Sequence, residues 1–237
     1  MSTIATNIAK VGTRIREAAQ AAERDPDEVL LLAVSKTQPA AAIREASEAG
    51  LHDFGENYLQ EALEKQAELA DLPLVWHFIG PIQSNKTKLI AEHFDWVHSV
   101  DRLKIAQRLS NLRPDHLAPL NLCLQVNVSG EASKSGCEPQ EVHELAQAIA
   151  ALPRLRLRGL MAIPEPTGDP AEQRAAFARL RQLQTELPLD LDTLSMGMSQ
   201  DLEAAIAEGA TWVRIGTALF GARAYPSQVA ADAPPHD

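Results

Sequence analysis

Short apolar runs alternate with longer amphipathic stretches along most of the chain, and this alternation predicts strands connected by helices. Eight runs have the length and apolar content of buried strands: Val29–Lys36, His52–Gly55, Leu74–Gly80, Trp96–Val100, Asn121–Val128, Leu157–Ile163, Thr193–Met198 and Trp212–Phe220. Because helical stretches separate the runs, neighbouring strands are expected to pair in parallel through right-handed crossovers.

The amphipathic stretches predict seven helices between the strands and one before them. They cover Pro39–Gly50, Tyr58–Leu69, Asn85–His93, Arg102–Leu112, Pro139–Ala150, Pro170–Glu186 and Gln200–Glu208, with the leading helix at about Ile4–Glu23. Eight strands in 237 residues predict the α/β class, as a (β/α)8 TIM barrel with an additional N-terminal helix. An open doubly wound sheet is the alternative, but residues 35–39 lack its glycine-rich turn.

The barrel is predicted to form a single domain over residues 1–224. The remaining segment, residues 225–237, is rich in alanine, proline and aspartate. We expect this tail to be disordered, because such a composition offers little apolar surface to bury.

Composition narrows the function classes. Hydrophobic residues make up 45% of the chain, and a net charge of −10 argues against a general affinity for nucleic acid or anionic membranes. No run approaches the roughly 20 apolar residues of a membrane helix, and no secretory signal opens the sequence. Cys123 and Cys137 indicate packing residues in a reducing cytoplasm. His93 and His98 are interpreted as surface or packing residues, so no metal site is predicted.

Candidate chemistry begins with Lys36, which ends the first apolar run. A lysine delivered by a buried strand is partly desolvated, so its pKa can fall and its amine can attack an aldehyde. The alternative is a lysine that only marks the return of the chain to solvent. In this barrel, active groups lie at the carboxyl ends of strands, where Asn57 and His77 are also expected.

The last two strands indicate an anion site. Ser199 is a candidate N-cap for the following helix, whose amino end would favour phosphate, although a cap alone is the simpler reading. Arg214 lies within an apolar strand and needs either a carboxylate partner or a ligand. Gly216 and Thr217 follow it and complete a candidate phosphate cup. An amine facing an anion site predicts a phosphorylated aldehyde, with pyridoxal 5′-phosphate as the obvious candidate.

Several motifs in this order resemble the pyridoxal phosphate homeostasis proteins, which are similar to the N-terminal domain of alanine racemase. The resemblance extends from the first strand to about Arg223 and is carried by residues 33–37, 54–57, 76–86, 133–136, 158–161, 194–199 and 214–217. The run Trp76–Lys86 is the most specific of them. A second lysine is expected soon after Lys36 in close relatives, but Gln38 stands there, which puts an exchange of cofactor between two neighbouring lysines in doubt.

The resemblance implies a role for each candidate residue. Lys36 would hold pyridoxal 5′-phosphate as a Schiff base, and Arg214 would face the pyridine nitrogen. The remaining cofactor-binding residues would be Ser199, Gly216 and Thr217 at the phosphate, with Asn57 and His77 near the cofactor. Lys134 is a candidate for a weaker contact, or else a solvated surface lysine. The implied function is intracellular homeostasis of the cofactor by storage, buffering or delivery, with transient contact to pyridoxal phosphate-dependent apoenzymes.

An enzyme of the racemase or decarboxylase type is the alternative within this cofactor class. It would need a second acid or base opposite Lys36. In alanine racemase-like enzymes a tyrosine of an added C-terminal domain supplies this base, and here only Tyr58 and Tyr225 occur. Arg214 cannot give its proton to the pyridine nitrogen, which weakens carbanion chemistry. We therefore expect no catalytic residues and, without the added domain, a monomer. A Schiff-base aldolase acting on sugar phosphates is the third alternative.

Overall fold

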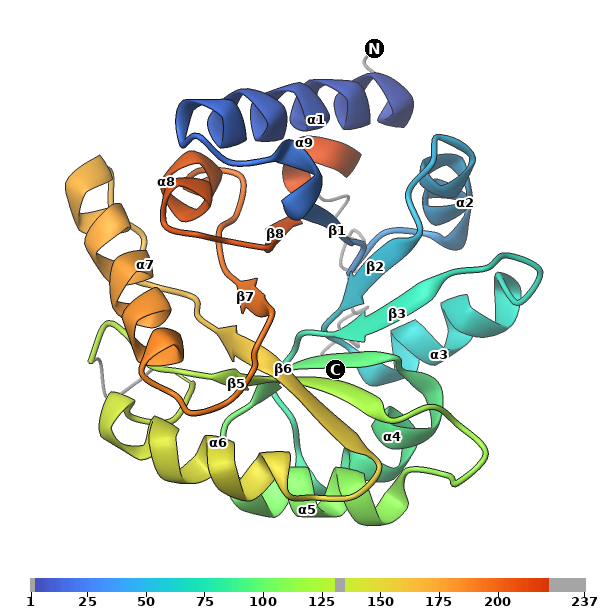
Figure 1. Ribbon diagram of the computed structural model, residues 1–237. Coiled ribbons are helices and arrows are strands. Elements are labelled where there is room, and N and C mark those ends of the chain that lie inside the picture. The colour runs from blue at the N-terminus through green and yellow to red at the C-terminus, as the bar shows by residue number, and fades with distance from the viewer. Residues whose placement is uncertain (1–2, 131–134, 222–237) are drawn as a thin grey trace, which may run out of the picture.

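The strands close into a barrel, as the alternation predicts (Figure 1). The computed structural model describes residues 3–130 and 135–221. All eight strands are parallel, and β1 pairs with β8, with Leu30 opposite Trp212. Their bounds are β1 Leu30–Val34, β2 Asp53–Glu56, β3 Val75–Phe78, β4 Trp96–Val100, β5 Leu120–Gln125, β6 Leu155–Met161, β7 Thr193–Ser195 and β8 Trp212–Ile215. The (β/α)8 prediction is confirmed, and the open sheet is wrong.

Helices surround the barrel in Figure 1, and the predicted N-terminal helix is present. Their bounds are α1 Ile4–Ala21, α2 Ala40–Glu48, α3 Leu59–Glu68, α4 Thr87–His93, α5 Leu103–Leu112, α6 Val142–Ala150, α7 Pro170–Thr185, α8 Leu202–Ala207 and α9 Thr217–Phe220. Three 3-10 turns, Pro26–Glu28, Ser84–Lys86 and Pro139–Glu141, precede β1, α4 and α6. The Thr3 hydroxyl accepts a hydrogen bond from the Thr6 amide and caps α1.

The predicted C-terminal bound of the last strand, Phe220, is wrong. β8 ends at Ile215, and the residues from Thr217 to Phe220 form the short helix α9. A short apolar run has no periodicity that separates strand from helix. The helix lies against α1, where the Asn7 side-chain amide donates to the carbonyl of Leu219 at 2.8 Å.

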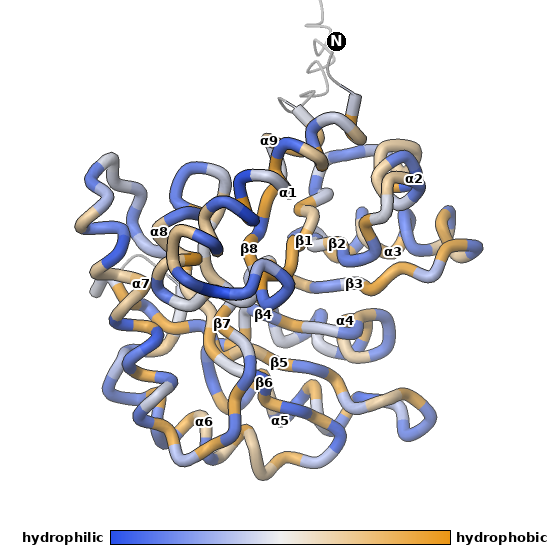
Figure 2. Tube along the Cα trace, turned by 45° about the horizontal axis from the view of Figure 1, so that its top comes forward, coloured by the Kyte–Doolittle hydropathy of each residue, from blue (hydrophilic) through white to orange (hydrophobic). Residues whose placement is uncertain are grey.

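Alternate residues of the strands face two different environments. Val97 belongs to the large apolar cluster between strands and helices, whereas its neighbours Trp96 and His98 face the barrel interior. Figure 2 shows hydrophobic residues along the strands and at intervals along the helices. Inside the barrel, a small apolar cluster of Trp96, Cys123 and Met161 lies beside buried polar groups. The barrel interior is therefore where charged and titratable side chains are shielded from water.

Cys123 and Cys137 are both buried and are not joined to each other. Burial raises the pKa of each thiol to about 12, so both remain protonated near neutral pH. In residues 3–130 and 135–221, no helix is both long and apolar enough to cross a membrane. The same residues contain no group of three or more His, Cys, Asp and Glu side chains suited to a metal. Lys134 and the tail 225–237 lie outside the described residues.

Candidate functional site

Lys36 leaves the barrel two residues after the end of β1. The Ser35 amide donates to the carbonyl of Gly55 at 3.0 Å, which continues the pairing with β2 to the barrel mouth. The next residue, Thr37, has a φ of 64°. A β-branched residue rarely adopts this left-handed conformation, so the turn that carries Lys36 is held by contacts outside itself.

Three charged residues supply those contacts, and we call Glu56, Glu61 and Lys65 the lysine clamp. The Lys65 ammonium donates to the carbonyl of Ser35 at 2.8 Å and to the Glu56 carboxylate at 2.8 Å. It also forms an ion pair with Glu61. Glu61 in turn accepts the backbone N–H of Thr37 at 2.6 Å. The clamp therefore holds the backbone on both sides of Lys36.

The clamp is a buried charge network. The side chains of Glu56 and Lys65 are 0% and 6% exposed. Burial raises the pKa of Glu56, and the neighbouring Lys65 charge and the Ser35 hydroxyl oppose that shift. Sequence reasoning missed these residues. The signals available were the i,i+4 spacing of Glu61 and Lys65 and a carboxylate immediately after the second apolar run.

Asn57 lies just beyond β2, as predicted, and its buried side-chain carbonyl oxygen has no hydrogen-bond partner among the residues that the structure describes. The backbone of Asn57 contacts Gly80 so closely that a Cβ at position 80 would collide with it. The loops after β2 and β3 therefore meet at Asn57. A buried acceptor without a donor is unusual in proteins and fits a ligand group that donates to it.

Arg214 lies on β8, and its side chain is turned into the barrel. It is 4% exposed. Its guanidinium donates to the Ser195 carbonyl at 2.6 Å, to the Ser195 hydroxyl at 2.8 Å and to the Ala162 carbonyl at 2.9 Å. Among the described residues, no carboxylate forms an ion pair with it within 4.0 Å. The carboxylate partner considered from sequence is therefore not found there, and the charge is held by neutral oxygens.

Burial lowers the pKa of Arg214 to about 10, and the nearby charge of Asp201 opposes that shift. A pKa of about 10 still leaves the guanidinium protonated at neutral pH. Arg214 is therefore a buried cation that donates hydrogen bonds and keeps its proton.

The predicted cap at Ser199 is wrong. α8 begins at Leu202, with Asp201 at the cap position, and the Asp201 carboxylate accepts the Met198 amide at 2.6 Å. An aspartate that can reach back three residues competes for the local amides, which moves the helix start beyond Ser199. Ser199 lies in the turn between β7 and α8 with a half-buried side chain, and its carbonyl accepts from Arg14 at 3.1 Å.

Gly216 and Thr217 follow β8 at the same end of the barrel. A Cβ at position 216 would lie 3.2 Å from the Val34 carbonyl oxygen, so glycine allows the end of β8 to approach β1 closely. Thr217 is exposed and opens α9. The barrel thus brings the predicted residues Lys36, Gly216 and Thr217 to the carboxyl ends of two neighbouring strands.

His77 lies within the barrel rather than at its mouth. Its ring is fully buried and contacts the carboxylate of Asp53 at 2.9 Å and the ring of His98 at 2.9 Å. Asp53 is the first residue of β2, so the His77 ring is directed to the amino ends of the strands. His98, interpreted from sequence as a surface or packing residue, is also fully buried and contacts the Ser195 hydroxyl at 2.8 Å.

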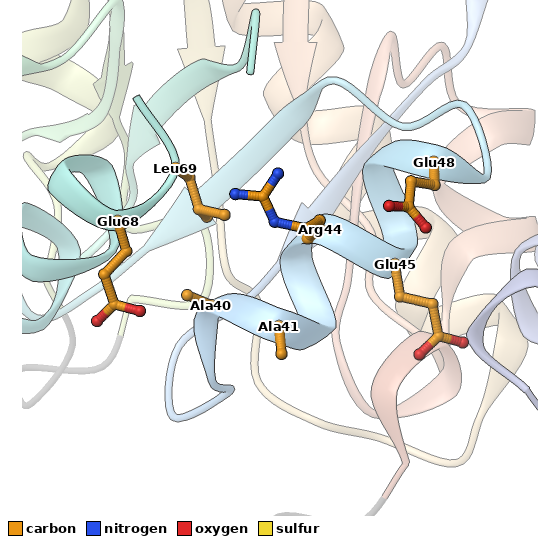
Figure 3. A pocket seen from close by; sticks show the side chains of 7 residues that line it. All are labelled: Ala40, Ala41, Arg44, Glu45, Glu48, Glu68 and Leu69. Atoms are coloured by element: carbon orange, nitrogen blue, oxygen red, sulfur yellow. The ribbon is translucent and has the colours of Figure 1, made fainter. Parts of the chain in front are cut away.

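A hollow of about 340 Å³ lies on the outer surface between α2 and α3 (Figure 3). Its lining includes none of the predicted site residues. Three of its side chains are the carboxylates Glu45, Glu48 and Glu68, and Arg44 pairs with Asp71 at 2.7 Å. This acidic hollow is poorly suited to an anionic ligand.

Comparisons with known proteins agree with the barrel and its motifs. The family model described as alanine racemase, N-terminal domain, matches residues 6–224. A pyridoxal phosphate homeostasis protein of Pseudomonas aeruginosa is 79% identical over 225 residues, covering 95% of this chain and 98% of the relative. The protein of that name from Escherichia coli K12 is 55% identical over 232 residues, covering 95% and 99%.

Two solved structures share this fold, one over its whole chain and one over part of a longer chain. PipY of Synechococcus elongatus, in a structure with PLP bound, is 46% identical with a TM-score of 0.77, covering 87% of this chain and all of that one. An alanine racemase of Corynebacterium glutamicum is 19% identical with a TM-score of 0.65, covering 94% of this chain and 62% of that one. The second similarity concerns the fold alone.

Proposed function

Because the chain belongs to the pyridoxal phosphate homeostasis proteins, within the alanine racemase N-terminal domain family, we propose that it binds pyridoxal 5′-phosphate as a Schiff base on Lys36. Its function in this proposal is to store, buffer and deliver the cofactor. PipY, whose structure contains PLP, supports the choice of ligand. When bound, pyridoxal phosphate supplies an aldehyde that bonds reversibly to amines and a ring that withdraws electrons.

The observation that carries the proposal is the buried charge of Arg214 beside the strand that delivers Lys36. β1 and β8 are neighbours, with Leu32 opposite Arg214. A buried cation whose partners in the described part of the chain are neutral oxygens is costly unless a ligand completes its surroundings. The pyridine nitrogen of the cofactor is an acceptor that the guanidinium can satisfy. The buried oxygen of Asn57, which has no partner among residues 3–130 and 135–221, is a second group that fits a ligand at the same end of the barrel.

Each remaining residue has a defined task in this proposal. The hydroxyls of Ser199 and Thr217 bind the phosphate together with the backbone at Gly216. Lys36 anchors the aldehyde, and the lysine clamp orients its turn. His77 does not contact the cofactor itself but supports Arg214 from within the barrel. We also propose that the barrel domain spans residues 1–224 and that the protein works as a cytoplasmic monomer with transient contacts to apoenzymes.

The test of the ligand and its anchor is a visible absorption spectrum of the purified protein, with added pyridoxal phosphate, before and after borohydride. We expect a yellow band that reduction fixes onto the peptide containing Lys36. Lys36→Ala should lose the band, while Lys104→Ala, an exposed lysine on α5, should keep it. A colourless protein, or label on another lysine, would contradict the proposal.

A second measurement separates a carrier from an enzyme. Arg214 keeps its proton, so the pyridine nitrogen it faces remains unprotonated and withdraws fewer electrons. Tyr58, the one tyrosine in the described part of the chain, is 55% exposed and is no buried base. We expect the loaded protein to exchange the α-hydrogen of amino acids in heavy water no faster than free pyridoxal phosphate. Faster exchange would favour a racemase or decarboxylase.

A further inference from the structure

Five side chains form a continuous hydrogen-bonded path through the barrel, and we call them the histidine chain. The path runs from Asp53 to His77 at 2.9 Å, to His98 at 2.9 Å, to Ser195 at 2.8 Å and to Arg214 at 2.8 Å. Its members come from five different strands, β2, β3, β4, β7 and β8. It connects a carboxylate at the amino end of the barrel with the buried cation proposed to face the cofactor.

With both rings neutral, the position of every proton along this path follows from its Asp53 end. A carboxylate only accepts, so His77 carries its proton on Nε2 and donates to Asp53. Nδ1 of His77 is then an acceptor, so His98 carries its proton on Nε2 and donates to it. Nδ1 of His98 in turn accepts from the Ser195 hydroxyl, whose oxygen accepts from Arg214. All links point in one direction, so the dipoles reinforce one another.

The surroundings favour the neutral form of both rings. Burial lowers the pKa of His77, which the Asp53 carboxylate opposes, and burial lowers that of His98 further, aided by His77 and Arg214. Trp96 stacks on His77 with ring centroids 5.5 Å apart, and Trp212 meets its edge at 5.0 Å. The other charged or titratable groups facing the path are Asp95 at His77, with Asp201 and Cys123 at Arg214.

Only the far end of the path reaches solvent. The side chain of Asp53 is 31% exposed, whereas that of His77 is fully buried. Arg214 has no carboxylate within 4.0 Å in the described part of the chain, so the aligned dipoles that lead to Asp53 act on its charge together with the Ser195 and Ala162 carbonyls and the more distant Asp201. The path also fixes the Ser195 hydroxyl as an acceptor for Arg214.

We propose that His77 and His98 are positioning residues, which hold the Arg214 guanidinium at the barrel mouth by linking it through Ser195 to Asp53. Their effect on the cofactor rests on the function proposed above, because it requires the pyridine nitrogen to lie against Arg214. The direction of the hydrogen bonds along the histidine chain does not depend on that function. A break in the histidine chain loosens Arg214, while the anchor at Lys36 stays intact.

The first test reads the protons directly in the cofactor-free protein. With 15N-labelled histidine, NMR at pH 7 to 8 should find His77 and His98 neutral and protonated on Nε2 throughout. The two signals are assigned from their loss in His77→Gln and His98→Asn. A proton on Nδ1 of either ring, or an imidazolium, would overturn the proposal without reference to any ligand.

The second test uses two substitutions that each remove one link of His98. His98→Asn keeps an acceptor for the Ser195 hydroxyl near the place of Nδ1 and loses the link to His77. His98→Gln keeps a donor toward His77 and loses that acceptor. We expect His98→Gln to weaken the binding of pyridoxal phosphate about tenfold, because the Ser195 hydroxyl is then free to turn and its hydrogen bond to the charged Arg214 is weakened. His98→Asn should weaken it less.

The exposed His93 provides the control, because His93→Asn should leave binding unchanged. The band fixed by borohydride should stay on Lys36 in all three variants. Parent-like affinity in His98→Gln would refute the positioning role. If the parent itself takes up no pyridoxal phosphate, the proposed function fails, but the histidine tautomers measured by NMR still show whether the histidine chain exists. The same NMR measurement on the parent decides this question if a His98 variant does not fold.

Discussion

The lysine side and the arginine side of the barrel mouth are held by different chemistry. On the lysine side, the lysine clamp of formal charges lies between β2 and α3 and holds backbone atoms at Ser35 and Thr37. On the arginine side, a path of neutral rings and a hydroxyl inside the barrel holds the charged side chain of Arg214 itself.

This difference matches what each residue must do in the proposed function. Lys36 must be able to act as a neutral amine, so its turn is fixed through the backbone. Arg214 must remain charged, so its nitrogens are bound directly by oxygens and its charge is balanced at a distance. One side therefore depends on ion pairs, and the other depends on the protonation state of two histidines.

The largest expected effect comes from breaking the clamp. Lys65→Met leaves Glu56 buried without its counter-ion, which should lower the free energy of unfolding by about 3–5 kcal/mol. Urea denaturation measures this loss. Adding Glu56→Gln should recover part of it, because the unpaired charge is gone. Lys88→Met, which removes an exposed partner of Glu92, is the control and should have almost no effect. An equal loss in both lysine variants would contradict a buried clamp.

The second-largest effect is expected from acid, which should lower the free energy of unfolding through the two histidines on the arginine side. The pKa values of His77 and His98 are lowered in the folded protein, so their stabilising contribution is present above the ordinary histidine pKa and is lost as the pH falls toward the folded values. Each should add a slope of up to about 1.4 kcal/mol per pH unit below pH 6.5. Urea unfolding of the parent and of His98→Asn at several pH values should show a shallower slope in the variant. Equal slopes would mean that His98 does not titrate in this way.

Substitutions in the proposed phosphate cup should weaken cofactor binding without changing the absorption spectrum of the bound cofactor. Ser199→Ala combined with Thr217→Ala removes two hydroxyl donors, which should weaken retention of pyridoxal phosphate by about tenfold or more. The absorption band of the bound cofactor should not move, because the anchor at Lys36 is unchanged. Dialysis followed by absorbance measures the retention. Thr13→Ala on the exposed face of α1 is the control, and equal retention by the double variant and the parent would count against the phosphate cup.

The smallest effect is expected at the turn beside Lys36. Thr37→Asn should raise the free energy of unfolding by about 0.5–1 kcal/mol, because asparagine adopts the left-handed conformation more readily than a β-branched residue. The backbone N–H that Glu61 accepts is retained. Thermal unfolding measures the gain, with Thr6→Asn in α1 as a comparison that should bring no gain. A destabilised Thr37→Asn would show that the threonine side chain itself supports the turn.

Much of the architecture follows from the sequence alone. The alternation of apolar runs and amphipathic stretches predicted the barrel, its leading helix and the bounds Trp96–Val100 of β4. It also identified Lys36 at the exit of the first strand and the charged Arg214 within the apolar last strand. These features depend on neighbours along the chain, since strand and helix periodicities repeat within a few residues.

Other features were decided only when the barrel closed. Ser195 and Arg214 are 19 residues apart, and Ser195 and His98 are 97 apart, so no local pattern could pair them. The segment after β8 forms the helix α9 against α1, and Asp201 took the cap position expected of Ser199. The sequence determined the strands and placed an amine and a cation on two of them. Only the register of the closed barrel decided which groups surround each charge, because hydrogen bonds and ion pairs act over a few ångströms between residues that the chain keeps far apart.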